Sequence, residues 1–376
     1  MEEKRNWWTS FGKWNFAFFF RLIQTISIKW SHIFLYMGLE DKSVYEDNYK
    51  SSLLKTSLLG KEFPNPLGIA AGFDTEFKYN DELVRFGFGF EEFGTFTLHP
   101  DEKLPFKIHY LSSLKALVVN APAFKNKGIS FAQKALIGRR HLPYIAGISL
   151  ASNAITEEED GAENRFIYEK IEKELVECVR HVAPYCDYIT LNLSHPQLPV
   201  SSLAINLGIL KQVVLQLKEV IHAIAPIANP RLLLKVPLDI SPEHIPLLCE
   251  TMIETGVDGV IVGGYLNANR ENRKILRRFA YGYITGKPIK EATLQAVDQF
   301  YNVLQGRIPI IASGGIFTGD DAFEMIQAGA SLVQIHTAII YEGPSVAKKI
   351  NRRLAELLRK SSYKTIAEVV GSKNKH

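Results

Sequence analysis

The strongest constraint on the fold is an alternation of short apolar runs with longer amphipathic stretches, which begins near residue 65. Runs rich in β-branched and aromatic residues predict strands over residues 66–71, 89–93, 145–150, 188–193, 232–236, 259–262, 308–312 and 332–336. Helical stretches are expected over residues 76–86, 166–182, 203–225, 242–255, 289–304, 320–328 and 345–360. Eight strands that alternate with helices predict an α/β fold of the (β/α)8 TIM-barrel type.

An open, doubly wound sheet is the alternative architecture for this alternation. No Gly-x-Gly-x-x-Gly sequence follows the first predicted strand, which argues against a dinucleotide-binding sheet. No boundary divides residues 46–376, so we expect one barrel there, preceded by a helical segment over residues 1–45. Two long connections, residues 96–128 and 264–287, are expected to carry function at the C-terminal face of the barrel.

The first forty residues combine many aromatic side chains with interleaved cations. Arg21 and Lys29 interrupt the apolar run and no small-residue cleavage site follows it, which argues against a spanning helix and against a signal peptide. Tryptophan together with cations is typical of a helix that lies in the membrane interface. We therefore expect peripheral membrane association through residues 1–40, at the cytoplasmic face. The alternative is a helix packed against the barrel.

Charge and cysteine content argue against a nucleic-acid-binding protein and against a cysteine metal site. The net charge of +4 over 376 residues gives no strong reason to expect a nucleic-acid partner. Cys178, Cys186 and Cys249 lack the spacing of metal ligands, so we expect no metal site and three reduced, buried thiols.

Polar residues follow the fourth predicted strand at its C-terminal end, where parallel barrels place their chemistry. They are Asn192, Ser194 and His195. After the seventh and eighth strands come Gly314, Gly315, His336 and Thr337, at the usual place for a phosphate group held by backbone N–H groups.

Lys235 lies near the end of the fifth predicted strand. A lysine at a barrel rim is costly unless it meets negative charge, so Lys235 is expected to face a bound anionic group. The alternatives are a side chain that extends to solvent or one that pairs with Asp239.

At these residues the chain resembles the dihydroorotate dehydrogenase family, and specifically its membrane-associated, quinone-using class. The resemblance runs from about residue 65 to the C-terminus. It is carried by Asn65-Pro-Leu-Gly-Ile-Ala-Ala-Gly-Phe-Asp74, Gly87-Phe-Gly-Phe-Glu-Glu-Phe-Gly-Thr95, Ala312-Ser-Gly-Gly-Ile316 and Ala328-Gly-Ala-Ser-Leu-Val-Gln-Ile335. It implies a barrel that binds flavin mononucleotide (FMN), oxidises dihydroorotate in pyrimidine biosynthesis and passes the electrons to a quinone.

The resemblance also assigns residues to the cofactor. Those expected around the flavin ring are Ala70, Ala71, Gly72, Thr95, Ser149, Asn192 and Lys235. Those expected at the phosphate end are Gly286, Gly314, Gly315, His336 and Thr337. The substrate is expected to contact Asn120, Phe124, Asn192 and Gln197.

The substrate side departs from the family pattern. Thr75 replaces the lysine that follows Gly-Phe-Asp in the family, and Ser149 replaces the family's asparagine on the third strand. Its Thr-Asn-Thr after the sixth strand reads Gly263-Gly264-Tyr265, and its catalytic serine is replaced by His195. An imidazole with an ordinary pKa near 6.5 can take a proton near neutral pH, so His195 is the candidate base. The alternative is that His195 fills the space of a lost active site.

Three functions follow from these observations. The first is a quinone-linked dihydroorotate dehydrogenase with an altered substrate pocket. The second is a flavoprotein oxidoreductase of the same fold that acts on another small substrate. The third is a catalytically silent flavin-binding or membrane-associated interaction protein.

Overall fold

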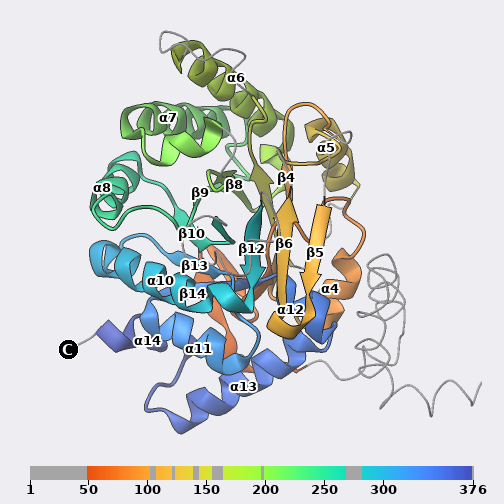
Figure 1. The fold of residues 1–376 in the computed structure, drawn as a ribbon, viewed down its shortest axis with the longest axis vertical. Coiled ribbons are helices and arrows are strands. Elements are labelled where there is room, and N and C mark those ends of the chain that lie inside the picture. Colours follow the sequence, from red (N-terminus) through yellow and green to blue (C-terminus); the bar gives the residue numbers. More distant parts are fainter. Residues whose placement is uncertain are drawn as a thin grey trace, which may run out of the picture.

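The computed structural model describes residues 49–101, 107–120, 123–138, 144–154, 164–195, 199–267 and 282–374. Eight parallel strands close into a barrel at its centre, surrounded by helices (Figure 1). The spatial order is β10-β13-β14-β3-β4-β7-β8-β9. These strands are β3 (Leu67–Ile69), β4 (Phe90–Phe96), β7 (Ile145–Leu150), β8 (Tyr188–Asn192), β9 (Arg231–Val236), β10 (Gly259–Gly263), β13 (Ile310–Ser313) and β14 (Ala330–Ile335). The expected TIM barrel is confirmed, and the open sheet is excluded.

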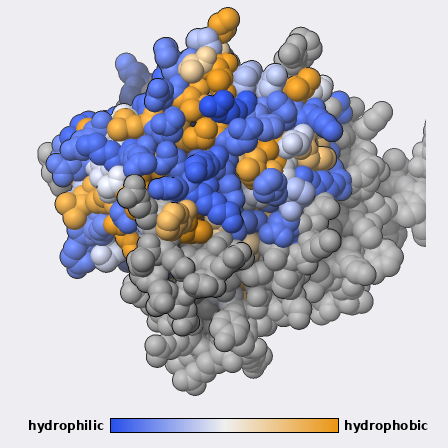
Figure 2. Space-filling view, turned by 90° about the horizontal axis from the view of Figure 1, so that it is seen from above, coloured by the Kyte–Doolittle hydropathy of each residue, from blue (hydrophilic) through white to orange (hydrophobic). Residues whose placement is uncertain are grey.

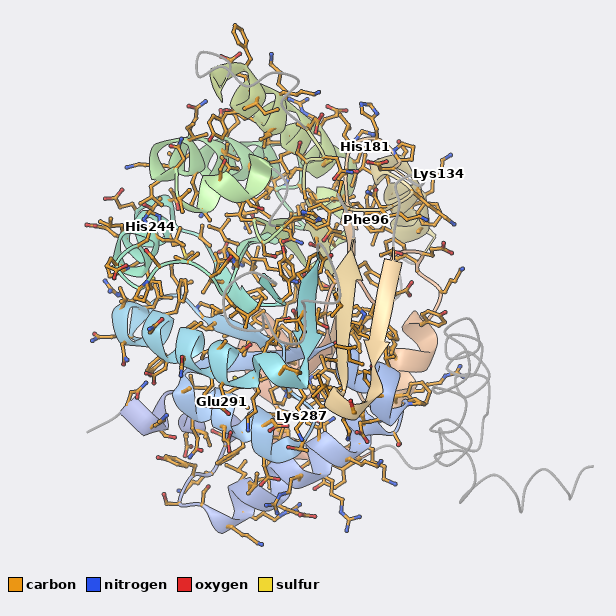
Figure 3. All side chains as sticks on the ribbon, viewed as in Figure 1. Phe96, Lys134, His181, His244, Lys287 and Glu291 are labelled. Atoms are coloured by element: carbon orange, nitrogen blue, oxygen red, sulfur yellow. The ribbon has the colours of Figure 1, made fainter. Side chains whose placement is uncertain are left out.

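Helices follow most of the strands, as the sequence predicted. The long ones are α6 (Asn164–Val182), α7 (Leu207–Ile224), α8 (Ile245–Thr255), α10 (Lys290–Leu304), α11 (Gly319–Ala328) and α13 (Val346–Lys360). The shorter ones are α4 (Asn80–Phe86), α5 (Ile129–Ile137), α12 (Thr337–Glu342) and α14 (Ile366–Val369). The 3-10 helices are η2 (Ser52–Leu54), η3 (Ser112–Leu114), η4 (Ala183–Tyr185), η5 (Pro199–Ala204), η6 (Lys287–Ile289) and η7 (Ser372–Asn374). Charged helix residues such as Lys134 point outward, whereas Phe96 of β4 lies inside (Figure 3).

The N-terminal end of the barrel interior is filled by apolar and aromatic side chains. A hairpin of β1 (Thr56–Leu58) and β2 (Lys61–Phe63) adds Phe63, whose ring packs edge-on against Phe90 at 5.4 Å. Because the hairpin meets residues near the strand starts, it closes the N-terminal end. This inner cluster consists of Phe63, Phe90, Ile145, Tyr188, Leu233, Ile261, Ile311 and Leu332.

The two long connections contribute a second sheet, which the sequence did not predict. Its order is β11-β12-β6-β5, with β5 (Lys107–Leu111), β6 (Ala116–Asn120), β11 (Leu266–Asn267) and β12 (Tyr283–Gly286). Alternate residues of a strand face opposite sides. Leu117 and Val119 of β6 therefore face the cavity described below, while Ala116 and Val118 pack with Ile284 on the other side.

Other expectations meet the structure only in part. Cys178, Cys186 and Cys249 are free and buried. The expected membrane-associating segment, residues 1–45, lies outside the described residues. No described helix is long and apolar enough to cross a bilayer. Viewed from above, the coloured surface is mainly hydrophilic with scattered hydrophobic groups (Figure 2).

The absence of a side chain at residue 147 is a packing requirement that can be tested. A Cβ atom at Gly147 would lie 2.0 Å from Cζ of the fully buried Tyr188 ring. We expect Gly147→Ala to lower the free energy of unfolding by about 1–3 kcal/mol, because overpacking forces the ring from its place. Urea unfolding measures the change. The control is Gly208→Ala in α7, where no atom lies within 4 Å and the change should stay below about 1 kcal/mol. Equal losses in the two variants would contradict this account.

Candidate active site

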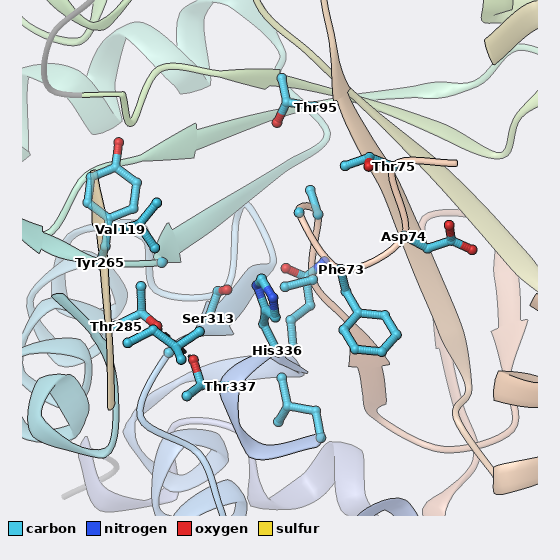
Figure 4. Close-up of a pocket in the computed structure, with 18 of the residues that line it drawn as sticks. Phe73, Asp74, Thr75, Thr95, Val119, Tyr265, Thr285, Ser313, His336 and Thr337 are labelled. Carbon is cyan, nitrogen blue, oxygen red and sulfur yellow. Dashed lines mark hydrogen bonds between the residues drawn. The ribbon is translucent and has the colours of Figure 1, made fainter. Parts of the chain in front are cut away.

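A cavity of about 490 Å³ opens at the C-terminal ends of the barrel strands. Its walls combine strand ends with β6 and β12 of the second sheet, so residues distant in the sequence meet around one space (Figure 4). Eleven of the twelve residues expected to hold the cofactor line it, namely Ala70, Ala71, Gly72, Thr95, Asn192, Lys235, Gly286, Gly314, Gly315, His336 and Thr337. The twelfth, Ser149, lies behind Thr95.

One end of the cavity is built from backbone and hydroxyl groups. Gly314 and Gly315 follow β13 with φ angles of +117° and +77°, a conformation that favours glycine. A Cβ atom at Gly315 would lie 2.4 Å from Cα of Lys290, so no side chain fits there. Thr337, which begins α12, shares a 2.7 Å hydrogen bond with Thr285 of β12. This end offers small residues and hydroxyl groups to an anionic ligand.

His336 stands at the end of β14 against the loop after β3. Its ring packs edge-on against Phe73 with centroids 5.9 Å apart. Gly72 beside it has a φ angle of +98°, a conformation that favours glycine. The imidazole lies between Phe73 and Ser313 (Figure 4).

A chain of hydrogen bonds fixes the polar groups at the ends of β4, β7 and β8. Nδ2 of Asn192 donates to Oγ1 of Thr95 at 2.9 Å, and Thr95 shares a 2.9 Å hydrogen bond with Oγ of Ser149. Oδ1 of Asn192 accepts from the backbone N–H and the hydroxyl of Ser194 at 3.1 and 2.7 Å. Ser149 therefore acts on the cavity through Thr95, and Asn192 is held from both sides.

The residues after β8 divide between two sides of the chain. Asn192 and Ser194 share one side and line the cavity, as residues two apart in an extended segment do. His195 does not line it. Its ring is buried behind Phe124 and Tyr283, with centroid distances of 4.7 and 6.0 Å. Burial lowers the pKa of His195 to about 4, so the imidazole is neutral at neutral pH.

The expected substrate residues are only partly described. Asn192 and Phe124 line the cavity. Asn120 ends β6, but its side chain and all of Gln197 lie outside the described part of the chain. The sequence had not selected the rings of Tyr265 and Tyr283, which also line the cavity; their centroids lie 4.2 Å apart and their planes are tilted by 30°. Burial raises the pKa of the Tyr265 phenol well above its ordinary value, although the Ser194 hydroxyl opposes this.

Lys235 is buried at the floor of the cavity with 5% of its surface exposed, so it does not extend to solvent. Within the described residues, the charge that acts on it is that of Glu92 and not that of Asp239. Burial lowers the pKa of its ammonium group, and the charge of Glu92 opposes that shift. Glu92, Thr190 and Gln334 form a polar layer with Lys235 inside the barrel. The sequence had not indicated this layer.

Comparison with known proteins agrees with this geometry. The sequence profile of the family Dihydroorotate dehydrogenase matches residues 53–358. A dihydroorotate dehydrogenase (quinone) of Erythrobacter litoralis is 32% identical over 343 residues, which cover 91% of this chain and 95% of that protein. The mitochondrial dihydroorotate dehydrogenase (quinone) of Mus musculus is 30% identical over 344 residues, which cover 89% of this chain and 83% of that protein.

Solved structures show the same fold. The crystal structure of DHODH from Eimeria tenella in complex with ferulenol superposes with a TM-score of 0.80 at 24% sequence identity. The superposition covers 93% of this chain and 96% of that one. With the profile match over most of its length and relatives above 30% identity, the chain belongs to the dihydroorotate dehydrogenase family.

Proposed function

We infer that this protein is an FMN-dependent oxidoreductase that oxidises dihydroorotate to orotate and passes the electrons to a quinone, as a step of pyrimidine biosynthesis. Family membership supports the first of the three functions considered above over the other two. The observation that carries the inference is the single cavity in which the residues assigned to the cofactor converge.

The residues present fit a flavin mononucleotide. Lys235 is buried and lines the cavity, so its ammonium group suits the polar edge of an isoalloxazine ring. Oε1 of Gln334 is buried with no hydrogen-bond partner within the described residues. Gly286, Gly314, Gly315, His336 and Thr337 are proposed to hold the phosphate end. When bound, the cofactor supplies the hydride acceptor.

The protein's own groups orient the substrate and move its proton. Asn192 and Ser194 present amide and hydroxyl groups to the cavity, which Phe124 also lines. Asn120 and Gln197 remain proposed substrate ligands. We propose His195 as the base, because a neutral imidazole accepts a proton. The structure adds a condition: Phe124 and Tyr283 must move aside for the imidazole to reach the substrate.

Two further features of the proposal concern the electron acceptor. The relatives named dihydroorotate dehydrogenase (quinone) support a quinone as acceptor. The aromatic and basic composition of residues 1–40 supports peripheral membrane association, at the cytoplasmic face, near a lipid-soluble acceptor.

Flavin bleaching tests the proposed function directly. We expect the purified protein to be yellow, and anaerobic dihydroorotate to bleach its flavin absorbance because the substrate hydride reduces the ring. Added quinone should then restore the colour. A stopped-flow absorbance record measures both steps, and buffer without dihydroorotate is the control. If dihydroorotate leaves the flavin oxidised but another small reductant bleaches it, dihydroorotate is not the substrate.

The base is tested by comparing two adjacent residues. We expect His195→Ala to slow flavin reduction by roughly 10²–10⁴-fold, the usual contribution of a general base. Ser194→Ala should slow it less than tenfold, because its hydroxyl orients Asn192 and lines the cavity without taking the substrate's proton. Single-turnover flavin reduction is the measurement. If Ser194→Ala is the slower variant, the base is Ser194 and His195 has a packing role.

The buried imidazole also predicts a pH dependence of stability. The pKa of His195 is about 4 in the folded protein and near 6.5 when unfolded, so the unfolded chain binds more protons between these values. This group therefore makes the free energy of unfolding rise with pH from 4 to 6.5, by about 3 kcal/mol in all. His195→Phe keeps a ring at the site and removes the titration. Urea unfolding across this range should show a shallower slope for the variant; parallel slopes would refute the assignment.

A further inference from the structure

Below the cavity, the barrel interior contains a layer of polar side chains instead of the apolar residues beneath it. Glu92 of β4, Thr190 of β8 and Gln334 of β14 are completely buried, and Lys235 of β9 is 5% exposed. Lys235 and Gln334 line the cavity, whereas Glu92 does not. The carboxylate is therefore a deeper group than the ammonium, which separates it from any bound cofactor.

The Glu92 carboxylate is fixed on one side. Its Oε2 accepts hydrogen bonds from Oγ1 of Thr190 at 3.0 Å and from Nε2 of Gln334 at 3.2 Å. Its Oε1 is buried and has no hydrogen-bond partner within the described residues. Burial raises the pKa of Glu92, while the charge of Lys235 and these hydrogen bonds oppose the rise. Two donors on one oxygen favour the charged carboxylate and hold its orientation.

The positive charge of Lys235 is balanced by one negative charge among the described residues. Glu92 is the only charged group in the described residues that raises the pKa of the buried ammonium. Glu92 acts on this ammonium group through its charge and not through a hydrogen bond, so the two groups interact across the barrel interior. A buried ammonium without a counter-charge loses its proton, because desolvation penalises the charged form.

We propose that Glu92 is a positioning residue that keeps Lys235 protonated at the cavity floor and so sets the reduction potential of the flavin bound there. This inference deepens the proposed function and depends on flavin binding. Lys235 lines the cavity and Glu92 does not, so the charged pair presents a net positive field to the cavity. A reduced flavin carries more negative charge than an oxidised one, and this field favours the reduced form.

The direction of the potential shift tests the proposal. In Glu92→Gln the lysine loses its counter-charge and its proton, so the preference for reduced flavin falls at least tenfold, which is about 30 mV for a two-electron couple. Lys235→Met should lower the potential similarly, and the double variant no further. An anaerobic redox titration followed by flavin absorbance measures it. A potential that rises in Glu92→Gln would show that Lys235 stays protonated without Glu92, and would overturn the proposal.

Two controls separate this proposal from general damage and from failure of the proposed function. Glu91→Gln removes the neighbouring carboxylate of β4, which accepts instead from Tyr144 at 2.9 Å, and should leave the potential unchanged. Urea unfolding of the same purified proteins needs no flavin. If Glu92 and Lys235 compensate each other, the double variant unfolds at a higher urea concentration than either single variant, since neither charge is left alone. If the double variant instead loses the sum of the stabilities that the two single variants lose, Glu92 and Lys235 do not compensate each other. A wild-type protein that binds no flavin would contradict only the cofactor assignment.

Discussion

Closure of the parallel hydrogen-bond ladder is the constraint on which the site depends. Eight strands pair in one ring, with β10 joined to both β9 and β13, so no edge remains in the barrel. Closure brings the C-terminal ends of all eight strands to one rim. Asn192, Lys235, Ser313 and His336 come from four strands and meet there only because the ring closes.

The closed ring also encloses an interior that side chains must fill. At the N-terminal end these side chains are apolar or aromatic: Phe63 and Phe90 pack with Tyr188, and Gly147 leaves room for that tyrosine ring. One layer higher, Glu92 and Lys235 replace such packing with buried charge, which costs stability unless each compensates the other. The inward side chains thus change from packing groups to charged groups as the strands approach the cavity.

The sequence predicted the strands well because buried parallel strands appear as isolated apolar runs between helices. Short motifs at strand ends also pointed to many of the residues that line the cavity. The second sheet was missed because β6 and β12 are short strands that pair across more than 150 residues of chain, and no local pattern records that pairing. Glu92 was missed for a different reason. Glu91 and Glu92 are adjacent, and only the register of β4 decides which one faces inward.

The stretch after β8 shows the limit of sequence motifs at a site. Alignment of Asn192-Leu-Ser-His195 with a family motif placed the imidazole at the base position, yet the backbone presents Ser194 to the cavity and packs His195 against Phe124. A motif gives the order of residues, whereas the direction of each side chain depends on strand twist and on the rings around it. Tyr283 of β12 and Tyr265, which precedes β11, supply further rings of the cavity wall. This part of the cavity is therefore shaped by the inserted sheet as much as by the barrel, so its side chains depend on pairings that no strand-end motif records.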